Sequence, residues 1–298
     1  MSIPQRPMNI WQALHKGERW LLLLKIIEME SIKEKFGEWA IVTGASSGIG
    51  KEFAIQLAKE GINLLVLARR EELLMELGQT LSNQYKVEVR IKKLDLTSEN
   101  FIGEIENQIS DIQVRLCISN AGAAFMGAFY RIPVSDLNSM VDLNVKSQLK
   151  IAHWFTTRLI KDKMKGGLLM VSSSIAYQGT PYAANYSAAK AYILNLGEAL
   201  NYEMKEHGIN VSVLVPGPTD APGLTERTDS NMKDSLPMKP QPAHELVHEG
   251  LRALLKNSPY RIGGKTNRFI TGMMGIIMSR KNASSFWGKK MKEMVYLK

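Results

Sequence analysis

Residues 39–50 read WAIVTGASSGIG, a short apolar run followed by a glycine-rich turn. The apolar run predicts a strand, and residues 49–59 predict an amphipathic helix. Gly44, Gly48 and Gly50 lie between the two, where they let an anion approach the backbone while the free N–H groups and dipole of the helix face it. The spacing G-x-x-x-G-x-G differs from the commoner G-x-G-x-x-G, so the inference depends on the position between strand and helix. We predict a pyrophosphate-binding turn here.

The alternation of strand and helix patterns continues along most of the chain. Strands are predicted at 40–43, 63–67, 87–94, 114–119, 168–171, 210–215 and 260–264, and helices at 49–59, 71–83, 99–109, 135–163 and from the segment around Tyr186 to His207. A regular β-α order implies a parallel sheet with helices on both faces. The predicted fold class is therefore α/β, a doubly wound parallel sheet with helical N- and C-terminal extensions.

The end of the second predicted strand bears on the choice of cofactor. An NAD site usually presents an acid about 20 residues after the glycines, whereas NADP requires positive charge for its 2′-phosphate. Here Arg69 stands nineteen residues after Gly50, with Ala68 before it and Arg70 after it. We therefore predict NADP as the cofactor. The alternative is a pair of solvated arginines at the start of a helix.

Tyr186 and Lys190 form the candidate chemical pair, within the stretch SSSIAYQGTPYAANYSAAK at 172–190. Their spacing places both side chains on one helix face. For Tyr186 to act as a general acid or base near pH 7, its pKa must fall by about 3 from its usual value of 10. One ammonium about 4 Å away supplies on the order of 4 kcal/mol, so Lys190 alone is expected to achieve most of that fall. Ser173, after the strand at 168–171, would converge on the same substrate oxygen. The alternative is an ordinary exposed helix.

Composition and charge limit the partners. The chain has 298 residues with 45% apolar and 22% charged side chains, which is typical of a globular protein. Its single cysteine, Cys117, excludes an intrachain disulfide, fits a reducing compartment, and leads us to expect a cytoplasmic protein. No apolar run reaches the roughly 20 residues that a membrane-spanning helix needs.

The net charge of +9 is concentrated in the last segment. Residues 261–298 hold nine Lys or Arg and one acid, Glu293. A basic tail on a neutral body indicates contact with an anionic surface rather than nucleic-acid binding by the core. Its apolar side chains leave three roles open: peripheral contact with a membrane, a subunit contact, or a border of the substrate pocket.

A competing motif lies at residues 244–248, HELVH, which matches the zinc-peptidase pattern H-E-x-x-H. A catalytic zinc needs a third protein ligand, and no Asp, Glu, His or Cys stands between Glu249 and Glu293. We expect no metal, and we expect His244 and His248 to be partly exposed on a helix. Zinc hydrolysis remains the minor alternative.

Six motifs in order give the chain a family resemblance. They are TGASSGIG at 43–50, SNAG at 119–122, Asn144 in DLNVKS, Ser173, YSAAK at 186–190 and PGPT at 216–219. In this the sequence resembles the short-chain dehydrogenase/reductase family over residues 39 to about 260. Two positions depart from the family pattern: Ser119 replaces an asparagine, and Ala221 stands where a threonine is often found.

The resemblance implies a Rossmann-type sheet of about seven strands and an active site with a tetrad. Tyr186 would exchange a proton with the substrate oxygen, Ser173 would orient the carbonyl, Lys190 would lower the tyrosine pKa and hold the nicotinamide ribose, and Asn144 would position a water relay. Ser46 and Arg69 would contact the 2′-phosphate, Asp95 the adenine end, and residues 216–219 the nicotinamide. The full set of expected cofactor-binding residues is Gly44, Ser46, Ser47, Gly48, Ile49, Gly50, Arg69, Arg70, Asp95, Leu96, Asn120, Ala121, Gly122, Tyr186, Lys190, Pro216, Gly217 and Thr219.

The sequence thus predicts three segments: an N-terminal helical extension at 1–38, a Rossmann-type dehydrogenase/reductase domain at 39–260 and a basic amphipathic tail at 261–298. It predicts an NADP(H)-dependent enzyme that interconverts a carbonyl and a secondary alcohol on an apolar ketone, acyl or steroid-like small molecule. Phe125, Met126, Tyr177, Tyr182 and the methionines of the 220–242 loop motivate the apolar substrate, and the loop is expected to be a mobile lid. We also expect a homo-oligomer. The alternative from another class is a catalytically idle NADP-binding assembly protein.

Overall fold

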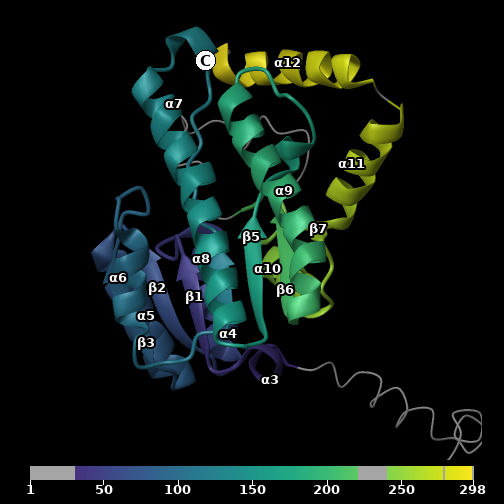
Figure 1. Ribbon diagram of the computed structural model, residues 1–298. Coiled ribbons are helices and arrows are strands. Elements are labelled where there is room, and N and C mark those ends of the chain that lie inside the picture. Colours follow the sequence, from purple (N-terminus) through teal and green to yellow (C-terminus); the bar gives the residue numbers. More distant parts are fainter. Residues whose placement is uncertain (1–30, 221–239, 278, 297–298) are drawn as a thin grey trace, which may run out of the picture.

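The chain is built on one parallel sheet of seven strands, seen in the computed structural model, which describes residues 31–220, 240–277 and 279–296 (Figure 1). The strand order is β3-β2-β1-β4-β5-β6-β7. The strands are β1 (Trp39–Thr43), β2 (Asn63–Ala68), β3 (Val89–Lys93), β4 (Leu116–Ser119), β5 (Gly166–Val171), β6 (Ile209–Val215) and β7 (Tyr260–Ile262). The predicted doubly wound α/β fold is confirmed.

Helices lie between the strands in the predicted order, and others precede the first strand and follow the last. They are α3 (Ile32–Phe36), α4 (Gly48–Lys59), α5 (Glu71–Tyr85), α6 (Phe101–Gln108), α7 (Val134–Val141), α8 (Ser147–Lys161), α9 (Ala184–Met204), α10 (Ala243–Leu255), α11 (Lys265–Ile277) and α12 (Arg280–Tyr296). The helix predicted at 135–163 is interrupted by η2 (Asp142–Lys146), a π-helical turn between α7 and α8. No helix among these described segments is long and apolar enough to cross a membrane.

Two apolar cores lie on the two faces of the sheet. Successive side chains of β1 point into alternate cores, as the two-residue period of a strand requires. Ala40 and Val42 belong to one core and Ile41 to the other. Helices α4, α5 and α10 cover the first face. Helices α6, α8 and α9 cover the second. Both faces of the strands are therefore buried, which explains why their sequences read as continuous apolar runs.

The strand order fixes where a ligand can bind. The chain runs outward from β1 to β2 and β3, then returns to place β4 on the other side of β1. The loops that leave the carboxyl ends of β1 and β4 consequently diverge and open a crevice at this switch point. The glycine turn after β1 and the SNAG segment after β4 both lie there.

The last two helices extend beyond the sheet. In Figure 1, α11 rises along one side and α12 crosses the end of the molecule above α9, with its far end beside the upper part of α7. Residues 1–30 of the predicted N-terminal extension lie outside the described residues, and so does most of the predicted lid, at 221–239. The ends of that loop meet in a bridge between Thr219 and Gln241.

Candidate active site

The glycine turn lies against the loop that follows β4. A Cβ placed on Gly50 would come within 2.3 Å of the carbonyl oxygen of Gly44 and 2.5 Å of the Asn120 amide nitrogen, so only glycine fits. Ser47 occupies the N-cap of α4 without a side-chain capping hydrogen bond. The first-turn N–H groups of α4 are thus left for a ligand, as an anion site requires.

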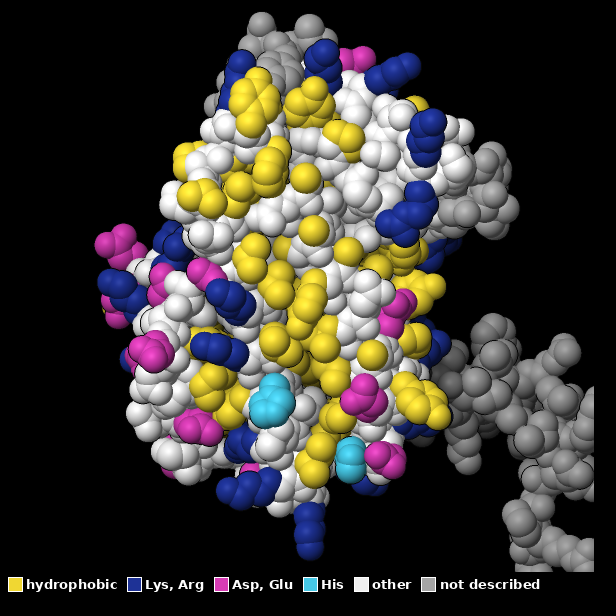
Figure 2. Space-filling view, turned by 45° about the horizontal axis from the view of Figure 1, so that its top comes forward, with side chains coloured by type: hydrophobic (Ala, Val, Ile, Leu, Met, Phe, Trp, Pro, Cys, Tyr) yellow, Lys and Arg dark blue, Asp and Glu magenta, His cyan; other side chains and the backbone are white. Residues whose placement is uncertain are grey.

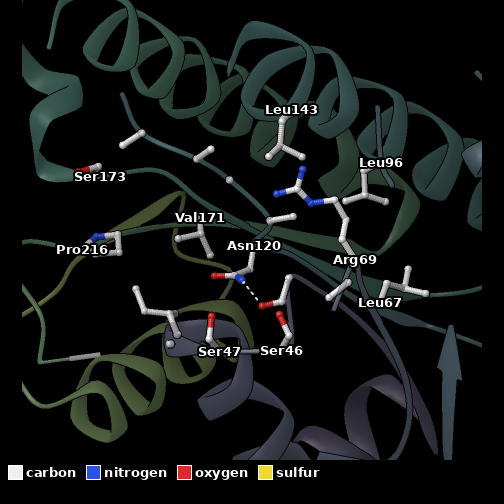
Figure 3. A pocket seen from close by; sticks show the side chains of 18 of the residues that line it. Ser46, Ser47, Leu67, Arg69, Leu96, Asn120, Leu143, Val171, Ser173 and Pro216 are labelled. Atoms are coloured by element: carbon white, nitrogen blue, oxygen red, sulfur yellow. Dashed lines mark hydrogen bonds between the residues drawn. The ribbon is translucent and has the colours of Figure 1, made fainter. Parts of the chain in front are cut away.

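Two arginines follow β2, and they take different positions. Arg70 donates from Nη2 to the Ser47 hydroxyl at 2.6 Å and to the Ser46 hydroxyl at 3.2 Å. Arg69 points across the pocket toward Leu143, away from both serines (Figure 3). Arg70 is therefore the arginine that bonds both serines, while Arg69 lines the same pocket from another position, and the expected contact of Ser46 and Arg69 with a 2′-phosphate stays a prediction.

Asp95 lies near Arg69 at the same end of the pocket. Burial alone would raise the Asp95 pKa, but hydrogen bonds from Thr97 and the charge of Arg69 outweigh burial and hold that pKa below its usual value. The carboxylate accepts from the Thr97 amide at 2.9 Å and from its hydroxyl at 2.8 Å. Asp95 is therefore an ionised, oriented acceptor at the edge of the pocket.

Polar side chains fix the loop after β4. The hydroxyl of Thr43 accepts the amides of Asn120 at 2.9 Å and Ala121 at 3.0 Å. Asn144 lies in the π-helical turn, is fully buried, and pairs with Ala123: its Oδ1 accepts the Ala123 amide at 2.8 Å and its Nδ2 donates to the Ala123 carbonyl at 2.6 Å. The role visible for Asn144 is to hold this loop.

Ser173, Tyr186 and Lys190 converge at the other end of the crevice. Ser173 follows β5, and Tyr186 and Lys190 lie one turn apart on α9, as predicted. Both α9 side chains are buried, and the ammonium nitrogen of Lys190 is 5.9 Å from the centre of the Tyr186 ring. That ammonium donates to the Val171 carbonyl at 2.9 Å, which directs it to the end of β5.

The pKa values of this pair differ from the sequence expectation. Burial raises the Tyr186 pKa to about 12, opposed only partly by the hydrogen bond with Ser173. Burial lowers the Lys190 pKa to about 8. The expectation that Lys190 alone depresses the tyrosine pKa is wrong, because desolvation raises the pKa of the buried phenol more than the hydrogen bond with Ser173 lowers it. Tyr186 is a protonated phenol at neutral pH.

One cavity of about 260 Å³ joins these groups. Of the predicted site residues, those that line it are Gly44, Ser46, Ser47, Gly48, Ile49, Arg69, Arg70, Asp95, Leu96, Asn120, Ala121, Gly122, Ser173, Tyr186, Lys190, Pro216, Gly217 and Thr219. Gly50 and Asn144 do not line it, but both contact residues that do: Gly50 packs against Gly44 and Asn120, and Asn144 bonds Ala123. The prediction missed Leu67, Ala68, Leu94, Ala123, Ala124, Leu143, Val171 and Ser172. Leu67, Ala68, Leu94, Val171 and Ser172 end or directly follow a strand predicted from the sequence, so the predicted strand ends were a usable signal for these five.

The residues expected at the substrate pocket and in the HELVH motif lie in different parts of the structure. Phe125, Met126 and Tyr182 pack around Tyr186, whereas Tyr177 belongs to a separate cluster with Leu194. His244 and His248 are exposed on α10, as expected. Within the described ranges, no group of three His, Cys, Asp or Glu side chains is placed to hold a metal ion.

The residues of the cavity fit a nicotinamide dinucleotide. A glycine turn and helix N-terminus stand ready for phosphate, basic and hydroxyl groups lie at one end, and Tyr186 and Lys190 lie at the other. Such a cavity at the switch point of a doubly wound sheet defines a nucleotide-binding oxidoreductase of the dehydrogenase type.

Comparisons with known proteins agree with this class. A model of the short chain dehydrogenase family matches residues 38–232. A 7beta-hydroxysteroid dehydrogenase of Mediterraneibacter gnavus is 29% identical over 239 residues, covering 80% of this chain and 90% of that protein. A solved 7beta-hydroxysteroid dehydrogenase structure matches with a TM-score of 0.78 at 24% identity, covering 86% of this chain and 99% of the other. The bulky-bulky ketone specific alcohol dehydrogenase from Comamonas testosteroni matches with a TM-score of 0.67 at 26% identity, covering 80% and 93%.

The chain belongs to the short-chain dehydrogenase/reductase family. It is an oxidoreductase that acts on CH–OH groups with a nicotinamide cofactor and a small-molecule substrate. The idle binding-protein alternative is therefore not supported.

Proposed function

We propose that the protein is an NADPH-dependent reductase that converts an apolar ketone to a secondary alcohol, with Tyr186 as the proton donor. The observation that carries this proposal is the convergence of Ser173, Tyr186 and Lys190 in the same cavity as the glycine turn and two arginines. Apolar side chains around Tyr186 favour an apolar substrate. The names of the relatives, a hydroxysteroid dehydrogenase and a bulky-ketone dehydrogenase, support the same substrate class.

The residues suggest how the proton moves. The cofactor, when bound, supplies a hydride to the carbonyl carbon, and the π electrons of the C=O bond move to the oxygen. The Tyr186 phenol, protonated at neutral pH, donates its proton to that oxygen. The Ser173 side chain is hydrogen-bonded to the Tyr186 phenol and would orient the same substrate oxygen. As negative charge develops on Tyr186, the nearby Lys190 ammonium stabilises it.

Preference for NADPH rests on Arg70, Arg69 and Ser46. The Arg70 guanidinium is already oriented toward the Ser46 hydroxyl. It could therefore form a charge-assisted hydrogen bond with a 2′-phosphate bound there. Arg70→Ala is expected to weaken NADPH binding about tenfold or more, because a hydrogen bond to a charged group contributes roughly 1.5–3 kcal/mol. NADH binding, which lacks that phosphate, should change less than threefold.

The central test uses purified protein, NADPH and a panel of ketones. Tyr186→Phe is expected to lower kcat for ketone reduction by at least a hundredfold while the dissociation constant for NADPH stays within threefold. Tyr202→Phe, on the exposed face of the same helix, is the matched control and should retain wild-type activity. A Tyr186→Phe variant as active as wild type would refute the assignment of the proton donor.

Two surfaces support proposals about partners. Figure 2 shows a band of apolar side chains on the face that α8 and α9 form, where Leu149, Ile160 and Tyr192 are exposed. We propose that a second copy covers this band, and expect Leu149→Lys to convert the assembly to monomers in sedimentation.

On α11 and α12, Phe269 and Phe286 are exposed, with Arg280, Lys281 and Lys289 also exposed on α12. This combination supports peripheral contact with anionic lipid. Vesicles containing anionic lipid should sediment the wild type better than a Phe269→Ser, Phe286→Ser variant. Equal sedimentation would remove the membrane proposal.

A further inference from the structure

A small apolar cluster lies on the side of Tyr186 away from the nucleotide turn. Its buried members are Ala124, Met140, Ala183, Tyr186 and Met291, and Phe125, Met126, Leu137, Ile175 and Tyr182 pack around them. Four stretches contribute: the loop after β4, helix α7, the segment from η3 (Ser174–Tyr177) into α9, and helix α12. Met291 is the member that comes from the C-terminal tail, more than 100 residues after Tyr186 in sequence.

The stretches nearest Tyr186 are fastened to one another by hydrogen bonds. The Gly127 amide donates to the Tyr182 carbonyl at 2.7 Å, which joins the loop after β4 to the segment before α9. The Asn185 side chain donates to the Leu137 carbonyl at 2.9 Å, which joins α9 to α7. These bonds give the cluster a fixed frame on the sides of the loop after β4, α7 and α9, and Met291 of α12 packs on the remaining side.

Helix α12 approaches that frame closely at Gly288, where it has no side chain. Ala283 and Met291 are buried on the inner face of the helix, and Trp287 is half-buried between them. A Cβ on Gly288 would stand 3.1 Å from the Cγ atom of Pro181, so the absence of a side chain there lets the helix rest on the segment before α9. The opposite face carries exposed Phe286 and Lys289.

The base of the tail is also anchored. Asn267 of α11 is buried, donates to the Gly263 carbonyl at 3.0 Å and packs against Gly217 at the end of the cavity. Arg268 of the same helix pairs with Glu249 of α10. Helix α12 is thus attached at its inner face and, through α11, at the carboxyl edge of the sheet.

The cavity and the cluster share two residues, Ala124 and Tyr186. Among the residues of α11 and α12 whose side chains the structure describes, none lines the cavity itself. Helix α12 therefore stands beyond the phenol from the nucleotide side, where the body of a substrate bonded to the reacting carbonyl would extend. From this juxtaposition we propose that α12 is the roof of the acceptor site and that Met291 sets how bulky a group fits beside the Tyr186 hydroxyl.

This inference rests on the proposed reductase function and adds a specificity-determining residue to it. A methionine suits that position because its unbranched, polarisable side chain adapts to apolar ligands of different shape. One methylene more or less in an apolar pocket changes specificity by roughly 10- to 200-fold. Truncating Met291 removes three heavy atoms, so the effect on selectivity should be easy to measure.

The test compares Met291→Ala and Met291→Phe with Phe286→Ala, a matched control on the outer face of α12. The readout is the ratio of kcat/KM for a steroid ketone to that for a small methyl ketone. Met291→Ala should raise this ratio at least tenfold and Met291→Phe should lower it, whereas Phe286→Ala should leave it within twofold. NADPH affinity should be unchanged in all three, since α12 does not line the nucleotide cavity.

Further arms keep the two proposals distinguishable. Calorimetric titration of the NADPH-loaded protein with the steroid ketone measures the dissociation constant of the ketone independently of turnover. Met291→Ala should change that dissociation constant at least fivefold. If Met291→Ala does not fold, the smaller truncation Met291→Val takes its place and should raise the ratio in the same assay. If the selectivity ratio and the ketone affinity of the folded variants stay within twofold of wild type, the proposal that α12 covers the acceptor site is refuted. Absence of turnover with intact ketone binding would instead overturn the reductase function, and absence of both would remove the two proposals together.

Discussion

Glu249 should hold the C-terminal helices to the body, and replacing it by glutamine measures that attachment. Its carboxylate accepts Arg261 Nε at 2.9 Å and Arg268 Nη1, with the Gln241 amide at 3.3 Å. Burial alone would raise the Glu249 pKa, but the two arginines outweigh burial and hold that pKa below its usual value. One carboxylate therefore joins α10, the end of β7 and the first turn of α11.

The expected magnitude follows from the exposure of the three groups. Glu249 is 21% exposed, Arg268 29% and Arg261 40%. A hydrogen bond to a charged group contributes roughly 1.5–3 kcal/mol when buried, and exposed ion pairs about 0–1 kcal/mol. We take about 2 kcal/mol for the two pairs after allowing for solvent screening. At about 2–4 °C per kcal/mol for a domain of this size, Glu249→Gln should melt about 4–8 °C below wild type.

The pH dependence gives a second signature. Because the folded-state pKa of Glu249 is depressed, its contribution is present above the unfolded-state pKa and is lost as pH falls through the folded value. The difference in melting temperature should therefore be full at pH 7 and should shrink as pH falls below about 4.3.

Melting is followed by circular dichroism, and limited proteolysis reports detachment of α11 and α12. Glu245→Gln, an exposed acid on α10, is the matched control and should melt within 1–2 °C of wild type. If Glu249→Gln melts at the wild-type temperature and the tail is cut no faster, the reasoning about this junction is wrong.

Three further predictions address the site and the core. Gly50→Ala should abolish NADPH binding in a fluorescence titration, because the added methyl group would collide with the Gly44 carbonyl; binding within tenfold of wild type would contradict the close packing seen there. The kcat/KM for ketone reduction should fall as pH rises through about 8, where the Lys190 ammonium is lost, and a profile flat to pH 9.5 would exclude that charge from the rate. Cys117, whose pKa burial raises to about 12, should react with Ellman's reagent only after denaturation, and rapid labelling of the native protein would show an open core.

The fold was predictable because periodicity and glycine placement are local. The run at 40–43 and the glycines after it indicate a strand, a turn and a helix without knowledge of any other segment. The same holds for Tyr186 and Lys190, whose spacing alone places them on one face of α9. Strand ends then located most of the cavity.

The features that could not be predicted depend on side-chain direction and on contacts between distant segments. Two adjacent arginines follow β2, and only the coordinates show that Arg70 bonds the serines while Arg69 crosses the pocket. The Tyr186 pKa depends on how completely the surroundings exclude water, which no spacing reveals. The contact of Met291 with the cluster around Tyr186 joins residues far apart in the chain.

The π-helical turn at 142–146 makes the long helix that contains it sensitive to the insertion or deletion of a residue. Such a turn holds one more residue than an α-helical turn, and one residue corresponds to a rotation of about 100° around the helix axis. Before it, Met140 of α7 faces the cluster around Tyr186; after it, Ile151 and Phe155 of α8 face the sheet. Deleting a single residue within 142–146 would turn one of these faces outward, so insertions and deletions should be tolerated in the surface loops of this protein long before they are tolerated here.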